Sequence, residues 1–287
     1  MADGTNDFEH LAEWVGRQES RDDVIAAAPA VALAATLDLG AAPSAQGDAL
    51  PPLWHWLYFL PVVRQSQLGP DGHPERGGFL PPVELPRRMW AGSQLVFHHP
   101  LSIGERVRRD SMITDVRHKH GRSGHLIFVV VRHEIHGSRG CAITEDQQIV
   151  YRGAAGPATT AAVEPQQRTA GWKRVVHPDP VLLFRYSALT FNGHRIHYDR
   201  PYAMDAEGYP GLVVHGPLLA TLLLDALRDA HPDRTVARFE FRAQRPLFDT
   251  ADFMVAGTLD SDDRTCTLWA ADLAGTTAMD AQAILAA

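Results

Sequence analysis

The densest group of chemically capable side chains lies between Tyr186 and Tyr202, in the stretch YSALTFNGHRIHYDRPY. His197 is its central residue, because an imidazole can take up or release a proton near neutral pH. Asn192 stands five positions earlier and carries an amide that does not titrate but can hold a water or orient a carbonyl. These residue types indicate proton transfer to or from a bound water. A polar loop whose His and Asn satisfy only backbone groups explains the composition equally well.

A second candidate group opens an apolar helix predicted from Gly216 to Ala230. Pro217 is favourable in a first helical turn, and Gly216 would let a ligand approach the backbone closely. Unpaired N–H groups at a buried helix start attract a carbonyl oxygen that becomes negative during reaction. Hydration of an α,β-unsaturated thioester passes through such an enolate-like state. Taken alone, an ordinary core helix with a proline start would explain the same residues.

Together the two groups resemble the (R)-specific enoyl-CoA hydratases of the MaoC type. Those enzymes carry Asp-x-Asn-Pro-Ile/Leu-His-x-Asp, followed by a helix that begins with His-Gly. Asn192 stands at the first Asp of that motif, Ile196 and His197 match Ile-His, and Asp199 matches the last Asp. The match of spacing strengthens the interpretation of both groups as one active site.

The departures from the motif resemble a subgroup of that family. Asn192 replaces the catalytic Asp, and His194 and Arg195 replace Asn-Pro. FNGHRIHYD and GYPGLVVHGPLLATLLL are similar to the double hot-dog mesaconyl-C4-CoA and itaconyl-CoA hydratases and to hydroxyacyl-thioester dehydratases type 2. The resemblance covers about residues 8 to 250. It implies an α+β tandem (double) hot-dog fold, each unit a helix wrapped by an antiparallel sheet.

The resemblance also implies an acyl-CoA hydratase/dehydratase that adds or removes water at an α,β-unsaturated CoA thioester. The expected substrate is a C5 dicarboxylyl-CoA, with mesaconyl-C4-CoA or itaconyl-CoA giving citramalyl-CoA. His197 would be the acid/base residue, Asn192 would hold the water through its carbonyl oxygen, and the Gly216 N–H would bind the thioester oxygen. Two alternatives remain open: a (3R)-hydroxyacyl-thioester dehydratase of fatty-acid synthesis, and a hot-dog protein that binds acyl-CoA without turnover.

Five further residues are candidate substrate-binding groups. A dicarboxylyl thioester needs a cation for its free carboxylate, and Arg185 and Arg195 flank the motif with side chains suited to bidentate pairing. Arg242 and Arg245 stand near the end of a predicted strand, where CoA phosphates could be bound. His215 could touch substrate or be structural. The alternative explanation for the four arginines is that they are solvated surface residues without a specific role.

The elements that must position these residues occur twice in the same order, a helix and then a meander of strands. In the first half, helical spacing over residues 22–39 and a Gly/Pro-rich surface loop over 69–86 precede strands at 94–97, 105–117, 125–136 and 142–152. In the second half, a strand near 181–186 precedes the helix 216–230 and strands at 235–244, 252–259 and 266–273. The order predicts a non-catalytic N-terminal unit at 1–155 that forms part of the acyl or CoA tunnel, a linker at 156–170 and a catalytic unit at 171–287.

The composition excludes several function classes. A formal net charge of −7 over 287 residues gives no basic balance that would favour nucleic acid as a partner. Cys141 and Cys266 have neither disulfide-framework nor metal-ligand spacing, so no metal and no cofactor are expected. The sequence shows no bilayer-length apolar run and no leader, so we expect no membrane association and a cytoplasmic protein. A homodimer or higher homo-oligomer is a possible assembly.

Overall fold

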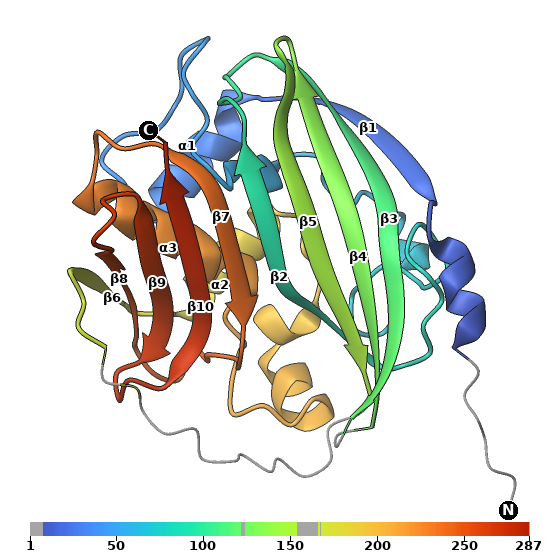
Figure 1. Cartoon of the computed structure of the whole chain (residues 1–287). Coiled ribbons are helices and arrows are strands. Elements are labelled where there is room, and N and C mark those ends of the chain that lie inside the picture. The colour runs from blue at the N-terminus through green and yellow to red at the C-terminus, as the bar shows by residue number, and fades with distance from the viewer. Residues whose placement is uncertain (1–7, 122–123, 154–165, 167, 287) are drawn as a thin grey trace, which may run out of the picture.

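One antiparallel sheet of ten strands runs through the part of the chain that the structure describes. This computed structural model describes residues 8–121, 124–153, 166 and 168–286. The first half of the chain supplies β1 (Gln18–Val24), β2 (Arg87–Phe97), β3 (Arg106–Gly121), β4 (Gly124–Gly137) and β5 (Gly140–Arg152). The second half supplies β6 (Trp172–Val176), β7 (Val236–Ala243), β8 (Phe253–Leu259), β9 (Thr265–Asp272) and β10 (Thr277–Leu285). Figure 1 shows them in the order β1-β3-β4-β5-β2-β7-β10-β9-β8-β6.

The strand order contains the repeat that the sequence predicts. The run β1-β3-β4-β5-β2 of the first half is followed by the same order in mirror image, β7-β10-β9-β8-β6. The halves meet where β2 pairs with β7, from Gly92 opposite Arg242 to Val96 opposite Arg238. Buried apolar residues of both halves also form one shared core cluster. The two units are therefore halves of one body, and most of the predicted linker 156–170 lies outside the described residues.

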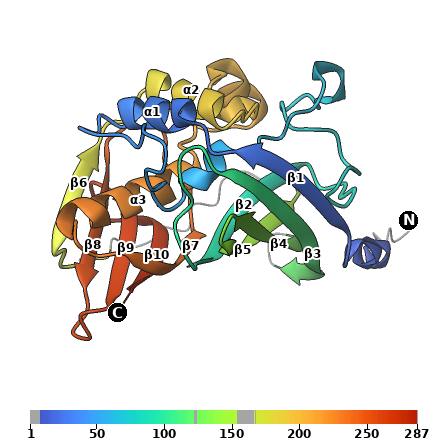
Figure 2. The same cartoon turned by 90° about the horizontal axis from the view of Figure 1, so that it is seen from above.

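Three α-helices of the described residues cover one face of the sheet: α1 (Ala27–Thr36), α2 (Pro180–Leu189) and α3 (Gly216–Ala230). Shorter helical turns are η1 (Glu9–Trp14), η2 (Trp54–Leu57), η3 (Gln65–Gln67), η4 (Arg195–His197) and η5 (Tyr202–Ala206). α3 packs directly on β6, β8 and β9, and α1 and α2 lie beside each other above it (Figure 2). The first half has no counterpart of α3, because residues 38–86 contain only short 3-10 turns. The helix wrapped by a sheet is thus complete only in the second half.

The strand predicted near residues 181–186 is wrong, because this segment begins α2. The side chain of Asp179 accepts hydrogen bonds from the N–H groups of Val181 and Leu182, and Pro180 occupies the first turn. These two features define a helix start. A short apolar run such as VLLF suits a buried strand or a buried helix equally, so periodicity could not decide. The polar segment that follows therefore leaves a helix end, not a strand end.

Three strands escaped prediction because their sequences carry weak β signals. β1 (QESRDDV) is charged and alternately exposed at one edge of the sheet, and β6 (WKRVV) is short and lies at the other. β10 (TAMDAQAIL) is rich in alanine, which is depleted in strands, yet it lies inside the sheet between β7 and β9. Within the described residues, no helix combines the length and apolar character needed to cross a bilayer.

Candidate active site

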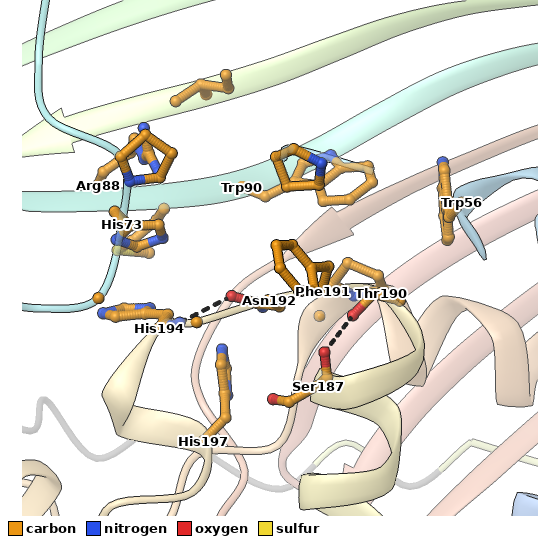
Figure 3. Close-up of a pocket in the computed structure, with 18 of the residues that line it drawn as sticks. Trp56, His73, Arg88, Trp90, Ser187, Thr190, Phe191, Asn192, His194 and His197 are labelled. Atoms are coloured by element: carbon orange, nitrogen blue, oxygen red, sulfur yellow. Dashed lines mark hydrogen bonds between the residues drawn. The ribbon is translucent and has the colours of Figure 1, made fainter. Parts of the chain in front are cut away.

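A cavity of about 1460 Å³ opens between the helical layer and the sheet, and both halves of the chain line it. The second half contributes the end of α2, the turn η4 and the start of α3. The first half contributes β2, β4, β5 and the loop over residues 55–81. The volume exceeds the usual 300–1,000 Å³ of a small-ligand site, so a long ligand can be accommodated. Figure 3 shows the polar end of this cavity.

His197 lies at the cavity wall with its tautomer fixed by the backbone. Its Nδ1 is 2.7 Å from the carbonyl oxygen of Val213, so Nδ1 carries the proton and donates it. Nε2 then bears the lone pair and has no hydrogen-bond partner among the described residues. Burial lowers the pKa of His197 from 6.5 to about 4. The side chain is therefore a neutral base at neutral pH.

His215 holds the ring of His197 from behind. The two rings stack with centroids 3.7 Å apart and planes inclined by 18°. Nε2 of His215 lies 2.8 Å from the Ser187 hydroxyl, and the residue is 1% exposed. His215 does not line the cavity. The structure thus places His215 behind the His197 ring, where it can position that ring, and a substrate contact of His215 stays a prediction.

Asn192 is turned toward the cavity by the end of α2. Phe191 adopts a left-handed backbone (φ 50°), and the N–H of Asn192 donates to the Ser187 carbonyl at 2.8 Å, which closes the helix. Its Oδ1 accepts the N–H of His194 at 3.0 Å, as Figure 3 shows. This bond fixes the amide orientation, since only the oxygen can accept. One lone pair of Oδ1, the oxygen expected to hold the water, is therefore occupied. The NH₂ group of Asn192 has no partner among the described residues.

Gly216 begins α3 at the cavity wall. Its N–H, as the first of the helix, has no acceptor among the described residues. A Cβ built on Gly216 would meet no atom closer than 4.0 Å. The protein itself therefore leaves room for a side chain here, and Gly216 is one of the residues that line the cavity. This geometry suits a donor that a ligand oxygen approaches closely.

The Gly/Pro-rich loop of the first half is docked on the Asn192–His197 segment and is not a free surface loop. Gly72 (φ +85°) lies against Gly193, and a Cβ on Gly72 would collide with the Gly193 carbonyl oxygen. The N–H of Arg195 donates to the Asp71 carbonyl at 2.9 Å. Two glycines without side chains thus allow backbone from the two halves to touch.

This docked loop brings a first-half histidine to the site. His73 Nδ1 lies 2.9 Å from Asp71 Oδ2, and the His73 ring packs on His194 with centroids 4.1 Å apart. The rings of His194 and His197 make an edge contact, with centroids 5.5 Å apart. Burial, with the neighbouring histidines, lowers the pKa of His194 to about 2, and burial lowers the pKa of His73. Although burial opposes it, the hydrogen bonds from His73 hold the pKa of Asp71 below its usual range.

Asp71, His73 and His194 are also the described residues that could hold a metal ion, with donor atoms within 4.8 Å of one another. The two rings lie over each other with an interplanar angle of 37°. Ring nitrogens bind a metal in the plane of the ring, so this close, tilted ring packing serves an aromatic contact better than coordination.

The four arginines considered from the sequence lie in different surroundings. Arg195 lines the cavity, but its guanidinium pairs with Asp199 at 2.7 Å and donates to the Pro70 carbonyl. Arg245 also lines the cavity, and it is held by Asp272 and two backbone carbonyls. Arg185 and Arg242 are exposed and lie outside the cavity wall.

Sequence reasoning missed three first-half residues at the site: His73 and Arg88, which line the cavity, and Asp71, which is hydrogen-bonded to His73. None belongs to a motif, and the loop that carries two of them has the composition of a surface turn. Gly193 inside the motif is the sequence feature that could have pointed to them, because a glycine there allows another backbone segment to pack closely. The partner itself cannot be read from the sequence.

The comparisons with known proteins agree with this architecture. A model of the family "Hydroxyacyl-thioester dehydratase type 2" matches residues 53–249. The mesaconyl-C(4)-CoA hydratase of Chloroflexus aurantiacus is 53% identical over 251 residues, covering 87% of this chain and 89% of that protein. The mitochondrial hydroxyacyl-thioester dehydratase type 2 of Schizosaccharomyces pombe is 32% identical, covering 70% of this chain and 75% of that one.

Solved structures show the same fold at low sequence identity. A MaoC-like dehydratase superimposes with a TM-score of 0.67 at 16% identity, covering 96% of this chain and 99% of that one. A Mycobacterium tuberculosis protein described as having a double hotdog fold gives a TM-score of 0.56 at 14% identity, covering 97% and 98%. The double hot-dog fold expected from the sequence is confirmed.

Proposed function

This chain belongs to the hydroxyacyl-thioester dehydratase type 2 family, and on that premise we propose that it is a hydro-lyase that hydrates mesaconyl-C4-CoA. The observation that carries the proposal is His197, a buried neutral base with a free Nε2 that lines the same cavity as Gly216 at the start of α3. The substrate assignment draws on the 53% identity to a protein of that activity.

The proposed reaction needs one base and one oxyanion donor. Nε2 of His197 takes a proton from a water while the water oxygen bonds to Cβ of the thioester. The π electrons move toward the thioester carbonyl, whose oxygen becomes negative and is stabilised by the Gly216 N–H. His197 then returns the proton to Cα, so the C=C bond is replaced by C–OH and C–H. Asn192 contributes its NH₂ group or the remaining lone pair of Oδ1 to hold the water.

A second candidate function is dehydration of a straight-chain 3-hydroxyacyl thioester. The observation that favours it is the match of residues 53–249 to the dehydratase family, with the fission yeast mitochondrial protein at 32% identity. The same base and donor serve this reaction in reverse. The two functions differ in the group that Cβ carries: a carboxylate and a methyl group, or an alkyl chain.

Ultraviolet assay of enoyl-thioester loss separates the two functions. We expect the purified chain to consume mesaconyl-C4-CoA with a kcat/KM at least ten times that for crotonyl-CoA, with itaconyl-CoA as a third substrate that tests tolerance of the double-bond position. A clear preference for crotonyl-CoA or longer straight chains would overturn the dicarboxylyl assignment and favour the dehydratase.

A further inference from the structure

We propose that Arg88 of β2, placed beside Tyr151 and His73, binds the free carboxylate of the substrate; the inference rests on the proposed function. In mesaconyl-C4-CoA this carboxylate is bonded directly to Cβ, the carbon that receives the water. A group that recognises it must therefore lie close to His197 and Asn192. Distant cations, however accessible, cannot serve this part of the substrate.

Other cavity-lining arginines are engaged or lie elsewhere. Arg195 and Arg245 form ion pairs, as described above. Arg109 lies near Glu19, and Arg76 donates to the Val83 and Pro86 carbonyls. Among the described residues, Arg88 and Arg152 line the cavity with neither an ion pair nor a hydrogen bond to a backbone carbonyl. These two guanidinium groups are thus available to an anionic ligand.

Arg88 is the one of this pair that reaches the catalytic end. Burial is the main cause of the lowered pKa values of His73 and His194, and the positive charge of Arg88 lowers both further. Arg152 is not among the charges that affect either histidine. Figure 3 shows Arg88 and His73 on the same wall, facing the segment that carries His194 and Asn192. His194 is in edge contact with His197. Arg88 therefore lies within reach of a group attached to Cβ.

The described surroundings of Arg88 do not neutralise it. On the sheet Arg88 stands opposite Tyr151 of β5, and its positive charge acts against the rise in the pKa of Tyr151 that burial causes. Burial raises the pKa of Tyr151, so its hydroxyl stays uncharged. Asp71, the carboxylate beside His73, accepts both the ring N–H and the backbone N–H of His73. Arg88 is thus a cation without a counter-ion in a part-buried wall, and such a group favours an anionic ligand. A neutral acyl chain would leave the guanidinium unpaired.

The test compares Arg88→Gln with Arg87→Gln on two substrates. Arg87 is the adjacent strand residue, lies outside the cavity wall and pairs with Glu207 at 3.0 Å, so it is a matched control. We expect R88Q to lower kcat/KM for mesaconyl-C4-CoA about 10- to 100-fold relative to crotonyl-CoA, the range set by loss of a charge-assisted hydrogen bond. R87Q should leave that ratio within about two-fold of the parent. An equal effect of R88Q on both substrates would overturn the proposal.

If R88Q does not fold, a second measurement tests the proposal. Succinyl-CoA and butyryl-CoA have chains of equal length, and only the first carries a carboxylate; both can be tested as inhibitors of crotonyl-CoA hydration by Arg88→Lys. Because Lys cannot pair bidentately, R88K should weaken succinyl-CoA several-fold more than butyryl-CoA. Equal weakening would contradict the role of Arg88. If the parent chain prefers crotonyl-CoA yet binds succinyl-CoA through Arg88, the proposed substrate fails and the carboxylate site stands.

Discussion

At the scale of single residues, the site separates a proton carrier from the groups that orient it. His197 gains its single tautomer from Val213 and its ring position from His215. In the proposed reaction Asn192 stands where the MaoC-type motif has a carboxylate, and its amide would keep the water site uncharged. A carboxylate there would face the substrate's own carboxylate across Cβ, at a distance where like charges repel by several kcal/mol in a part-buried site.

Asn192→Asp tests this electrostatic argument. The new carboxylate can still accept the His194 N–H, so we expect the fold to be retained. Repulsion should lower kcat/KM for mesaconyl-C4-CoA roughly ten-fold or more, and crotonyl-CoA hydration should fall less. Steady-state kinetics on both thioesters measures the ratio. A variant that improves the dicarboxylyl substrate would show that Asn192 does not lie near its carboxylate.

Only some of the residues of this site could be predicted from the sequence. Asn192, His197 and Gly216 share one motif and one helix start, so their spacing along the chain carried the information. Arg88 and His73 reach the cavity only through strand pairing and loop docking between the halves. Such contacts depend on three-dimensional placement, which local patterns do not encode.

At the scale of elements, the loop around Gly72 joins the two halves at the site. Its contact with Gly193 places Asp71 and His73 against His194. The sequence indicated a loop correctly from its Gly and Pro content. It could not indicate that the loop lies over the cavity, because composition says nothing about where a loop packs. The helix α2 was likewise misread, since its cap residue, Asp179, and not its apolar run, decided the structure.

Gly72→Ala should displace this loop. The added Cβ would collide with the Gly193 carbonyl, and the positive φ is strained for any L side chain. We expect hydration to fall at least ten-fold while the thermal midpoint falls only by a few degrees, because the core lies elsewhere. Gly40→Ala in the same 38–86 segment is the control, since its Cβ would meet open space and Gly40 lies outside the cavity wall. Equal activity of the two variants would show that loop docking does not matter to the reaction.

At the scale of the whole molecule, the two halves have the same strand order but different helical layers. The second half keeps its central helix α3, whereas residues 38–86 of the first half contain only short 3-10 turns and line the cavity from residue 55 to residue 81. The order of predicted elements was enough to find the repeat. The missing helix could not be predicted, because the helix expected over residues 22–39 already completes the repeated order of a helix followed by strands.

The buried histidines predict how the stability of the whole chain depends on pH. Burial lowers the pKa of His197 and of His133 to about 4, and that of His215 well below 6.5. Between pH 6.5 and about 4 the unfolded chain therefore binds protons that the folded chain does not. Stability should be complete above pH 6.5 and fall on acidification, by roughly 1–2 kcal/mol per such histidine at pH 5.

Urea unfolding at pH 7.5 and pH 5 measures this dependence. His133 lies outside the proposed chemistry, between Ser111 and Gln147, so His133→Gln should remove one histidine's share of the decrease. A free energy of unfolding that stays constant or rises at pH 5 would contradict the neutral state assigned to these side chains.

The central claim is that His197 transfers the proton in hydration, and His197→Gln tests it most directly. The amide can still occupy the ring's place but cannot titrate, so we expect kcat for mesaconyl-C4-CoA to fall by about 10²–10⁴-fold. His177→Gln, an exposed histidine whose ring lies far outside the cavity wall, should retain normal activity. Circular dichroism and the thermal midpoint would verify that both variants are folded. A folded H197Q protein that hydrates the thioester at near-normal rate would contradict the account.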